Sequence, residues 1–119
     1  MVPRSLLVVI ALAAAASWAW RSHVSANDGE LLAQRVQPGD IRMLSSETCG
    51  WCTAARRWMR SEGVAFEECF IERDAQCAAD YQARGDQGTP TLIVRGHTVV
   101  GFDRERLIEL VSGEAPPRR

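Results

Sequence analysis

Lysine is absent from this sequence, and histidine occurs only twice, at His23 and His97. All 14 basic side chains are therefore arginines, and they are scattered among 15 acidic residues for a formal net charge of −1. No basic block or arginine-rich face is visible, so the composition gives no sign of a nucleic-acid partner. The scarcity of histidine also disfavours a cysteine hydrolase, because its thiol needs a histidine within hydrogen-bond reach and only His97 could supply one.

The chain is short as well, since 119 residues hold one domain with a small core. Among residues 1–20 the only charged side chain is Arg4, which precedes an apolar run from Leu6 to Trp20. This run is longer than the core of most signal peptides and shorter than the roughly 18–20 residues of a membrane-spanning helix. A buried core helix is disfavoured because the run has no amphipathic period.

Residues 1–26 are predicted to be a signal peptide or a signal anchor. Small side chains near its end favour cleavage after Ala26, whereas Trp18 and Trp20 would suit the membrane interface of an uncleaved anchor. Both interpretations place the rest of the chain outside the cytoplasm, in the periplasm or an equivalent compartment. There it is either secreted or tethered to the inner membrane by residues 5–20.

Residues 27–40 are polar and have only a weak apolar pattern, which predicts a linker with one or two helical turns at most. Residues 41–113 form the predicted domain, and residues 114–119 a disordered tail. Apolar spacing and turn residues divide the domain into a strand at 41–44, a helix at 50–61, a strand at 64–71, a helix from the cap Asp74 to Arg84, a hairpin of 91–94 and 98–100, and a last helix capped by Asp103.

This order of elements predicts an α/β fold. Strand, helix and strand in succession require a parallel pair with a right-handed crossover, and the hairpin adds an antiparallel pair to the same sheet. On the first helix of the domain, Arg56, Arg57 and Arg60 are expected to face solvent. His97 is expected in the exposed turn of the hairpin.

Cys49-Gly50-Trp51-Cys52 lies at the predicted start of that first helix. Two thiols at this spacing can form and break a disulfide without unfolding the chain, and the helix N-terminus favours the thiolate of Cys49. Cys49 is therefore the candidate nucleophile, and Cys52, one turn further along and expected to be more buried, is the candidate resolving thiol. Glu47 acts in the opposite direction, because a nearby carboxylate raises the pKa of the thiol.

Two further cysteines, Cys69 and Cys77, admit three interpretations. In an oxidising compartment they can form a structural disulfide that joins the second strand to the following helix. They can also be buried free thiols, or a second redox pair that passes electrons to Cys49 and Cys52. A zinc site is disfavoured and no metal is predicted, because the second short Cys-x-x-Cys pair of a zinc ribbon is missing.

Taken together, these residues resemble the glutaredoxin branch of the thioredoxin superfamily, from about residue 41 to residue 111. Three segments in the same order carry the resemblance: Cys49-Gly50-Trp51-Cys52, Gly88-Thr89-Pro90-Thr91 and Val100-Gly101-Phe102-Asp103. The resemblance implies a thioredoxin-like fold, with a small mixed four-stranded sheet and helices on both faces. Here an N-terminal hydrophobic helix would precede it.

The resemblance also implies roles for individual residues. The bond between Thr89 and Pro90 would be a cis peptide facing the cysteine pair, and the backbone of Thr89 would pair with an extended substrate. The rest of the substrate-binding surface would consist of Trp51, Gly101, Phe102 and Asp103. The chain departs from the family in having Gly-Trp where Pro-Tyr is usual between the cysteines, and Ser46 where a lysine is usual.

The sequence thus predicts an extracytoplasmic thiol–disulfide oxidoreductase that uses Cys49 and Cys52, with no metal or organic cofactor. Its partners would be protein or glutathione disulfides and thiols. A redox partner in the membrane is a further option. Glutathione is only one option as a co-substrate, because the usual cation for its carboxylate is missing. A monomer is expected. The alternative is a redox-inert adapter of thioredoxin fold, in which the Cys49–Cys52 bond is a permanent structural disulfide.

Overall fold

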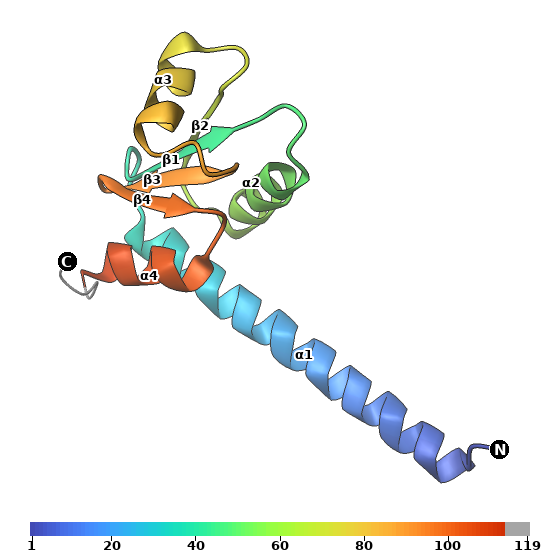
Figure 1. Ribbon diagram of the computed structural model, residues 1–119. Helices are drawn as coiled ribbons and strands as arrows, with labels where there is room; N and C mark the ends of the chain where they lie inside the picture. Colours follow the sequence, from blue (N-terminus) through green and yellow to red (C-terminus); the bar gives the residue numbers. More distant parts are fainter. Residues whose placement is uncertain (114–119) are drawn as a thin grey trace.

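Figure 1 shows the computed structural model, which describes residues 1–113 apart from the side chain of Ser25. The predicted disordered tail, residues 114–119, lies outside the described residues. In chain order the elements are α1 (Arg4–Arg35), β1 (Ile41–Ser45), α2 (Gly50–Glu62), β2 (Glu67–Phe70), α3 (Ala75–Ala83), β3 (Thr91–Val94), β4 (His97–Val100) and α4 (Arg104–Ser112).

The strands form one mixed sheet in the order β2-β1-β3-β4. β1 and β2 are parallel, whereas β3 is antiparallel to both β1 and β4. In this register Met43 of β1 lies between Glu68 of β2 and Leu92 of β3. The predicted parallel pair, the hairpin and their union in one four-stranded sheet are confirmed.

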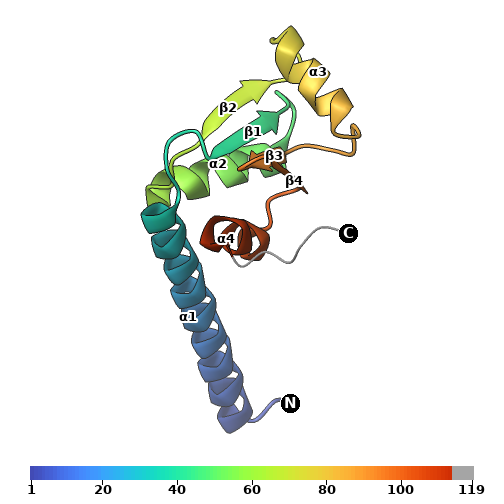
Figure 2. The same cartoon turned by 90° about the vertical axis from the view of Figure 1, so that its left-hand side faces the viewer.

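Helices cover both faces of the sheet, and each face has its own apolar cluster. Figure 2 shows α3 on one side and α2, α4 and the end of α1 on the other. The larger cluster joins Ile41, Met43 and Leu92 to buried residues of those three helices. The smaller cluster packs Leu44 and Ile93, which point the opposite way, against Cys77 and Tyr81 of α3. A mixed four-stranded sheet with helices on both faces is the arrangement expected from the sequence.

The helix boundaries follow the predicted capping residues. Gly63 ends α2 in the left-handed conformation at φ 72°, which glycine adopts without steric cost. Asp74 begins α3 by accepting hydrogen bonds from the N–H groups of Gln76 and Cys77. Asp103 begins α4 in the same way, through the N–H of Arg106. These residues fix where α2 ends and where α3 and α4 begin.

The prediction of a linker at residues 27–40 is wrong over most of its length. One uninterrupted helix, α1, continues through residue 35 into the domain. Leu32 is completely buried in the larger cluster and Val36 nearly so, because the last turns of α1 pack against α2 and α4. Apolar residues four positions apart share one helix face, and burying that face stabilises helix in an otherwise polar segment.

Two smaller expectations also fail. His97 lies in β4, paired with Val94, because the hairpin turn consists only of Arg95 and Gly96. Both turn residues have positive φ, 48° and 85°, as a two-residue hairpin loop of this kind requires. Arg56 was expected to face solvent with its neighbours, but it is half-buried against the sheet.

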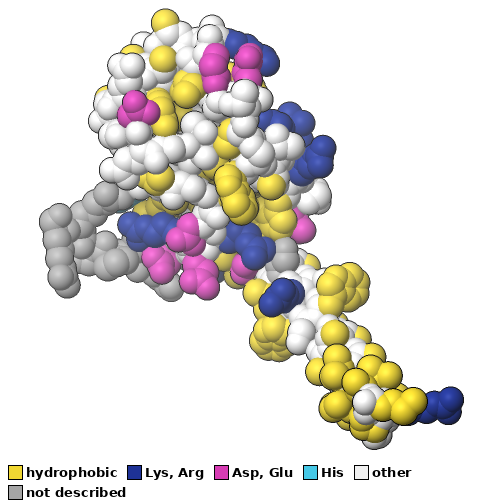
Figure 3. Space-filling view, turned by 45° about the vertical axis from the view of Figure 1, so that its right-hand side comes forward, with side chains coloured by type: hydrophobic (Ala, Val, Ile, Leu, Met, Phe, Trp, Pro, Cys, Tyr) yellow, Lys and Arg dark blue, Asp and Glu magenta, His cyan; other side chains and the backbone are white. Residues whose placement is uncertain are grey.

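Most of α1 projects away from the domain. Apolar side chains cover much of the projecting part in the view of Figure 3, and α1 is long and apolar enough to cross a membrane by length and composition. A signal sequence near the N-terminus would satisfy the same two criteria.

Candidate functional site

Cys49 and Cys52 form a disulfide at the N-terminus of α2, with their Cα atoms 5.2 Å apart. Cys49 is the N-cap residue, and its Sγ accepts a hydrogen bond from the N–H of Cys52 at 3.0 Å. Cys52 has no exposed surface, whereas Cys49 is only half-buried. An attacking thiolate from another molecule therefore has access to the sulfur of Cys49 but not to that of Cys52.

The helix start favours negative charge on the sulfur of Cys49. The first turn of a helix presents unpaired N–H groups and a partial positive charge, and one of those groups points directly at this Sγ. Both effects stabilise a thiolate relative to a thiol. Cys49 thus has the environment of a nucleophile, and Cys52 that of the thiol that closes the disulfide again.

A groove of about 520 Å³ lies beside the cysteine pair. It brings together α2, the segment before β3 and the connection from β4 to α4. Its lining is mostly apolar: Trp51, Ala54, Ala55, Trp58, Thr89, Pro90, Gly101, Phe102 and Arg104. The side chain of Trp51, between the two cysteines in sequence, is 79% exposed. A large exposed indole at the edge of an apolar groove is typical of a surface that binds another molecule.

The structure groups five of the six predicted substrate-binding residues around this groove. The Thr89–Pro90 peptide is cis, and the carbonyl of Pro90 accepts a hydrogen bond from the N–H of Gly101 at 2.7 Å. That bond joins the segment before β3 to the connection before α4. Asp103 is the exception, because it caps α4 and does not line the groove.

Arg104 also lines the groove, although it was not among the residues predicted from the sequence. Its guanidinium lies 5.3 Å from the ring centre of Trp58 and 3.8 Å from a carboxylate oxygen of Asp28 on α1. Trp58 itself packs edge-on against Phe102, with ring centres 5.5 Å apart. Trp58 is therefore a wall of the groove as well as a neighbour of the core. The only feature of the sequence that could have placed Arg104 near the groove is its position directly after Asp103, the cap residue of α4.

An ion pair beneath α2 holds this helix on the sheet. Arg56 donates two hydrogen bonds to the carboxylate of Glu68 on β2, at 2.7 and 2.8 Å, and Ser45 donates a third at 2.6 Å. Burial acts to raise the pKa of Glu68, but these hydrogen bonds outweigh it and hold the pKa below its ordinary value. Glu68 therefore stays ionised near neutral pH and anchors the helix that carries both cysteines.

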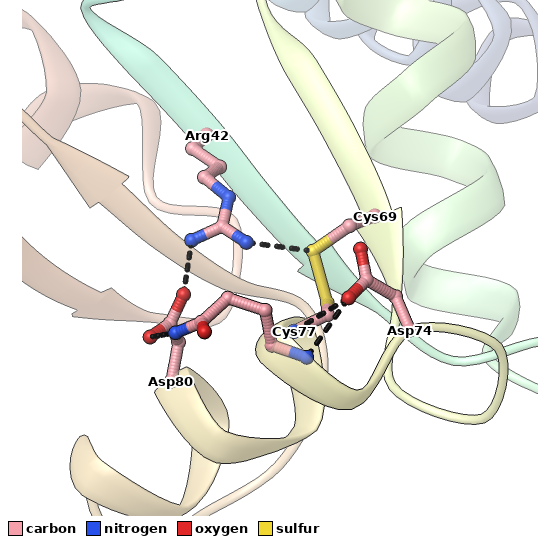
Figure 4. Close-up of polar contacts among 6 residues, drawn as sticks. Arg42, Cys69, Asp74, Cys77 and Asp80 are labelled. Carbon is pink, nitrogen blue, oxygen red and sulfur yellow. Dashed lines mark hydrogen bonds and ion pairs between the residues drawn. A yellow bond between two sulfur atoms is a disulfide. The ribbon is translucent and has the colours of Figure 1, made fainter.

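Cys69 and Cys77 form a second disulfide, which joins the end of β2 to the first turn of α3 (Figure 4). Arg42 of β1 points toward it and donates a hydrogen bond to Cys69 Sγ at 3.5 Å, while pairing with Asp80 of α3. The hydrogen bond from Arg42 is the main reason that the pKa of Asp80 is lowered. Within residues 1–113, no three His, Cys, Asp or Glu side chains gather as ligands for a metal ion.

Comparison with known proteins gives consistent matches for this domain. Residues 41–99 match the glutaredoxin family model. A curated relative, an uncharacterized glutaredoxin-like 8.6 kDa protein in the rubredoxin operon of Clostridium pasteurianum, is 24% identical over 73 residues, 60% of this chain and 97% of that protein. Among solved structures, the thioredoxin-like protein BC3987 in a mutant form is 27% identical with a TM-score of 0.55, covering 62% of this chain and 96% of that one. The glutaredoxin from Methanosarcina mazei is 22% identical with a TM-score of 0.53, covering 64% and 81%, and supports the fold alone.

Proposed function

From a chain that carries a glutaredoxin-like domain of the thioredoxin superfamily, we infer a thiol–disulfide oxidoreductase that works outside the cytoplasm. One observation carries the proposal. A half-exposed sulfur at a helix N-terminus is paired with a fully buried one, beside an apolar groove. A disulfide that served only as a staple would need neither the difference in exposure nor the groove.

The reaction is two successive exchanges at sulfur. In the reducing direction, the thiolate of Cys49 attacks one sulfur of a substrate disulfide, forms a mixed disulfide and releases the other substrate sulfur as a thiolate, which takes up a proton. The thiolate of Cys52 then attacks the sulfur of Cys49, so the Cys49–Cys52 disulfide forms and the second substrate thiol leaves. Two electrons pass to the substrate. In the oxidising direction the same steps run in reverse.

The groove beside Cys49 is the proposed docking surface. Trp51, Trp58 and Phe102 offer aromatic surface, and the backbone of Thr89 is the proposed partner of an extended peptide. The only charged side chain in the lining, Arg104, already lies near Asp28 and over the ring of Trp58. These partners offset the positive charge that glutathione would need for its carboxylate. Protein disulfides are therefore the proposed substrates, with glutathione as an optional donor.

The proposed location rests on α1. Its apolar first part follows a single basic residue, Arg4, and projects from the domain as a spanning helix would (Figure 1). With the amino terminus inside, the domain lies on the outer side of the membrane. A thiol reagent that cannot cross membranes should label Cys49 in intact cells after mild reduction. Labelling that requires lysis of the cells would place the domain inside.

The direct test is an insulin-reduction assay with dithiothreitol as electron donor, using the full chain in detergent micelles. The wild type should accelerate the precipitation of insulin chains, and Cys49→Ser should reduce the rate to that of dithiothreitol alone. Glu67→Gln, which changes an exposed carboxylate on β2, is the matched surface control and should behave like the wild type. A Cys49→Ser chain that is as active as the wild type would rule out the proposed chemistry.

A further inference from the structure

The connection between β2 and α3 lies against the residues that lead into the redox pair. Glu72 accepts hydrogen bonds from the N–H of Glu47, at 3.2 Å to each carboxylate oxygen, and another from the hydroxyl of Ser46. Arg73 forms an ion pair with the carboxylate of Glu47. The hydroxyl of Ser46 is the main cause that lowers the pKa of Glu72. One short segment thus contacts both residues of the turn that precedes Cys49.

These contacts support the position of Cys49. The turn they hold is closed by a hydrogen bond from the N–H of Cys49 to the carbonyl of Ser46, at 3.2 Å. The N–H of Thr48 also donates to the hydroxyl of Ser46, at 3.4 Å. Cys49 therefore enters the N-cap position of α2 from a turn whose start is fixed by Glu72.

The same contacts also affect the charge near Cys49. The carboxylate of Glu47 lies two residues before the nucleophile, where its charge opposes a thiolate. Arg73 brings a positive charge to that carboxylate and offsets it. If Arg73 moved away, the negative charge of Glu47 would no longer be balanced beside the turn that leads to Cys49.

The second disulfide encloses this segment. Cys69 and Cys77 are eight positions apart, with Glu72 and Arg73 between them. Within the segment, the carbonyl of Phe70 accepts hydrogen bonds from the N–H groups of Arg73 and Asp74, both at 3.1 Å. The Arg73 guanidinium also lies 4.6 Å from the ring centre of Phe70. A short closed loop has few conformations, so the disulfide restricts how far Arg73 can move from Glu47.

We propose that the Cys69–Cys77 disulfide is coupled to the redox site: it holds the segment from Ile71 to Asp74 against the turn before Cys49. Glu72 and Arg73 then act as positioning residues for that cysteine. This inference deepens the proposed function and rests on it for its biological meaning. The coupling itself can be measured on the thiol of Cys49 without any exchange reaction.

Other charged groups near this corner have partners of their own. On α2, Arg56 is paired with Glu68 of β2, and on α4, Arg104 lies near Asp28 of α1. Asp86, in the segment before the cis proline, is exposed and interacts with the hydroxyl of Tyr81 on α3. The carboxylates of Glu47 and Glu72 and the guanidinium of Arg73 are the charges attached to the Cys49 turn itself.

The test uses the full chain in micelles with Cys52→Ser, which leaves Cys49 as a free thiol and the Cys69–Cys77 disulfide closed. The rate of alkylation of Cys49 by iodoacetamide is followed against pH, and mass spectrometry verifies that the other pair is unlabelled. Arg73→Gln should raise the midpoint of this profile by a few tenths of a pH unit. Arg73→Lys keeps the positive charge, so its midpoint should lie close to that of the parent chain. Arg57→Gln, an exposed arginine of α2, is the matched control and should leave the midpoint unchanged.

The coupling is then tested by removing what holds Arg73. In a chain with Cys69→Ser and Cys77→Ser, Arg73→Gln should no longer shift the midpoint. Glu72→Ala, which keeps the disulfide, should weaken the same shift and serves if the chain without the disulfide does not fold. A shift of the same size in these backgrounds as in the parent would overturn the proposal, as would an Arg73→Gln profile identical to that of Arg57→Gln. Failure of the insulin assay would leave these profiles measurable, so the two hypotheses are tested separately.

Discussion

At the scale of single residues, Cys49 and Cys52 differ because of where the helix places them. The N-cap position leaves one sulfur half-exposed next to free N–H groups, and the first turn of α2 points the other into the core. The spacing of the cysteines at a strand-to-helix junction was enough to predict this asymmetry. The ion pair beneath them was not predictable. A helical period identifies apolar faces, whereas the pairing of Arg56 with Glu68 depends on how β2 aligns with β1.

That ion pair gives a prediction for stability. Arg56→Gln should reduce the free energy of unfolding near neutral pH by about 2 kcal/mol, because it leaves the carboxylate of Glu68 largely buried with a hydrogen bond from Ser45 and only the more distant charge of Arg60. The pKa of Glu68 is lower in the folded chain than its ordinary 4.5, so the ion pair stabilises the fold above that pH. The contribution is lost as pH falls through the folded value.

Urea denaturation in micelles, followed by tryptophan fluorescence at neutral and acidic pH, measures this difference. The difference in the free energy of unfolding between wild type and Arg56→Gln should be smaller in acid, where Glu68 is protonated in both chains. Arg57→Gln, one position along the same helix and exposed, should change stability by less than about 0.5 kcal/mol. A gap of equal size at both pH values would show that Arg56 acts by packing and not by charge.

At the scale of elements, the helices and strands of the domain were predictable because each has a local signal. Asp74 and Asp103 cap the helices they precede, and Gly63 ends α2. The last turns of α1 had no such signal, since residues 27–36 are mostly polar and their few apolar side chains only matter when α2 and α4 are in place. Tertiary packing, rather than helix propensity, decides the conformation there.

The packing of α1 can be tested by comparing two adjacent leucines. Leu32→Ala should lower the free energy of unfolding by about 3 kcal/mol, because it opens a cavity in the larger cluster. Leu31 is 37% exposed, so Leu31→Ala should cost less than about 1 kcal/mol. Urea denaturation of both variants in micelles gives the comparison. Equal losses would mean that residues 27–36 behave as the linker first expected and not as part of the domain.

At the scale of the whole molecule, α1 connects the domain to its apolar N-terminal part as one continuous helix. A helix of 32 residues is about 48 Å long, and its last turns belong to the core of the domain (Figure 2). Asp28 on this helix reaches Arg104 in the groove. If the first part of α1 spans a membrane, the redox groove is held in a fixed orientation to it. A flexible linker, as the sequence predicted, would have left that orientation free.

The most direct measurement of the central claim is a redox titration of the full chain in micelles, with the state of each cysteine pair read by alkylation and mass spectrometry. The Cys49–Cys52 pair should change state reversibly at a potential above about −300 mV, the range of disulfides that exchange with cellular thiols. Cys69 and Cys77 should stay oxidised over that interval. A Cys49–Cys52 bond that stays closed below about −300 mV would contradict the account and identify a structural disulfide in a redox-inert domain.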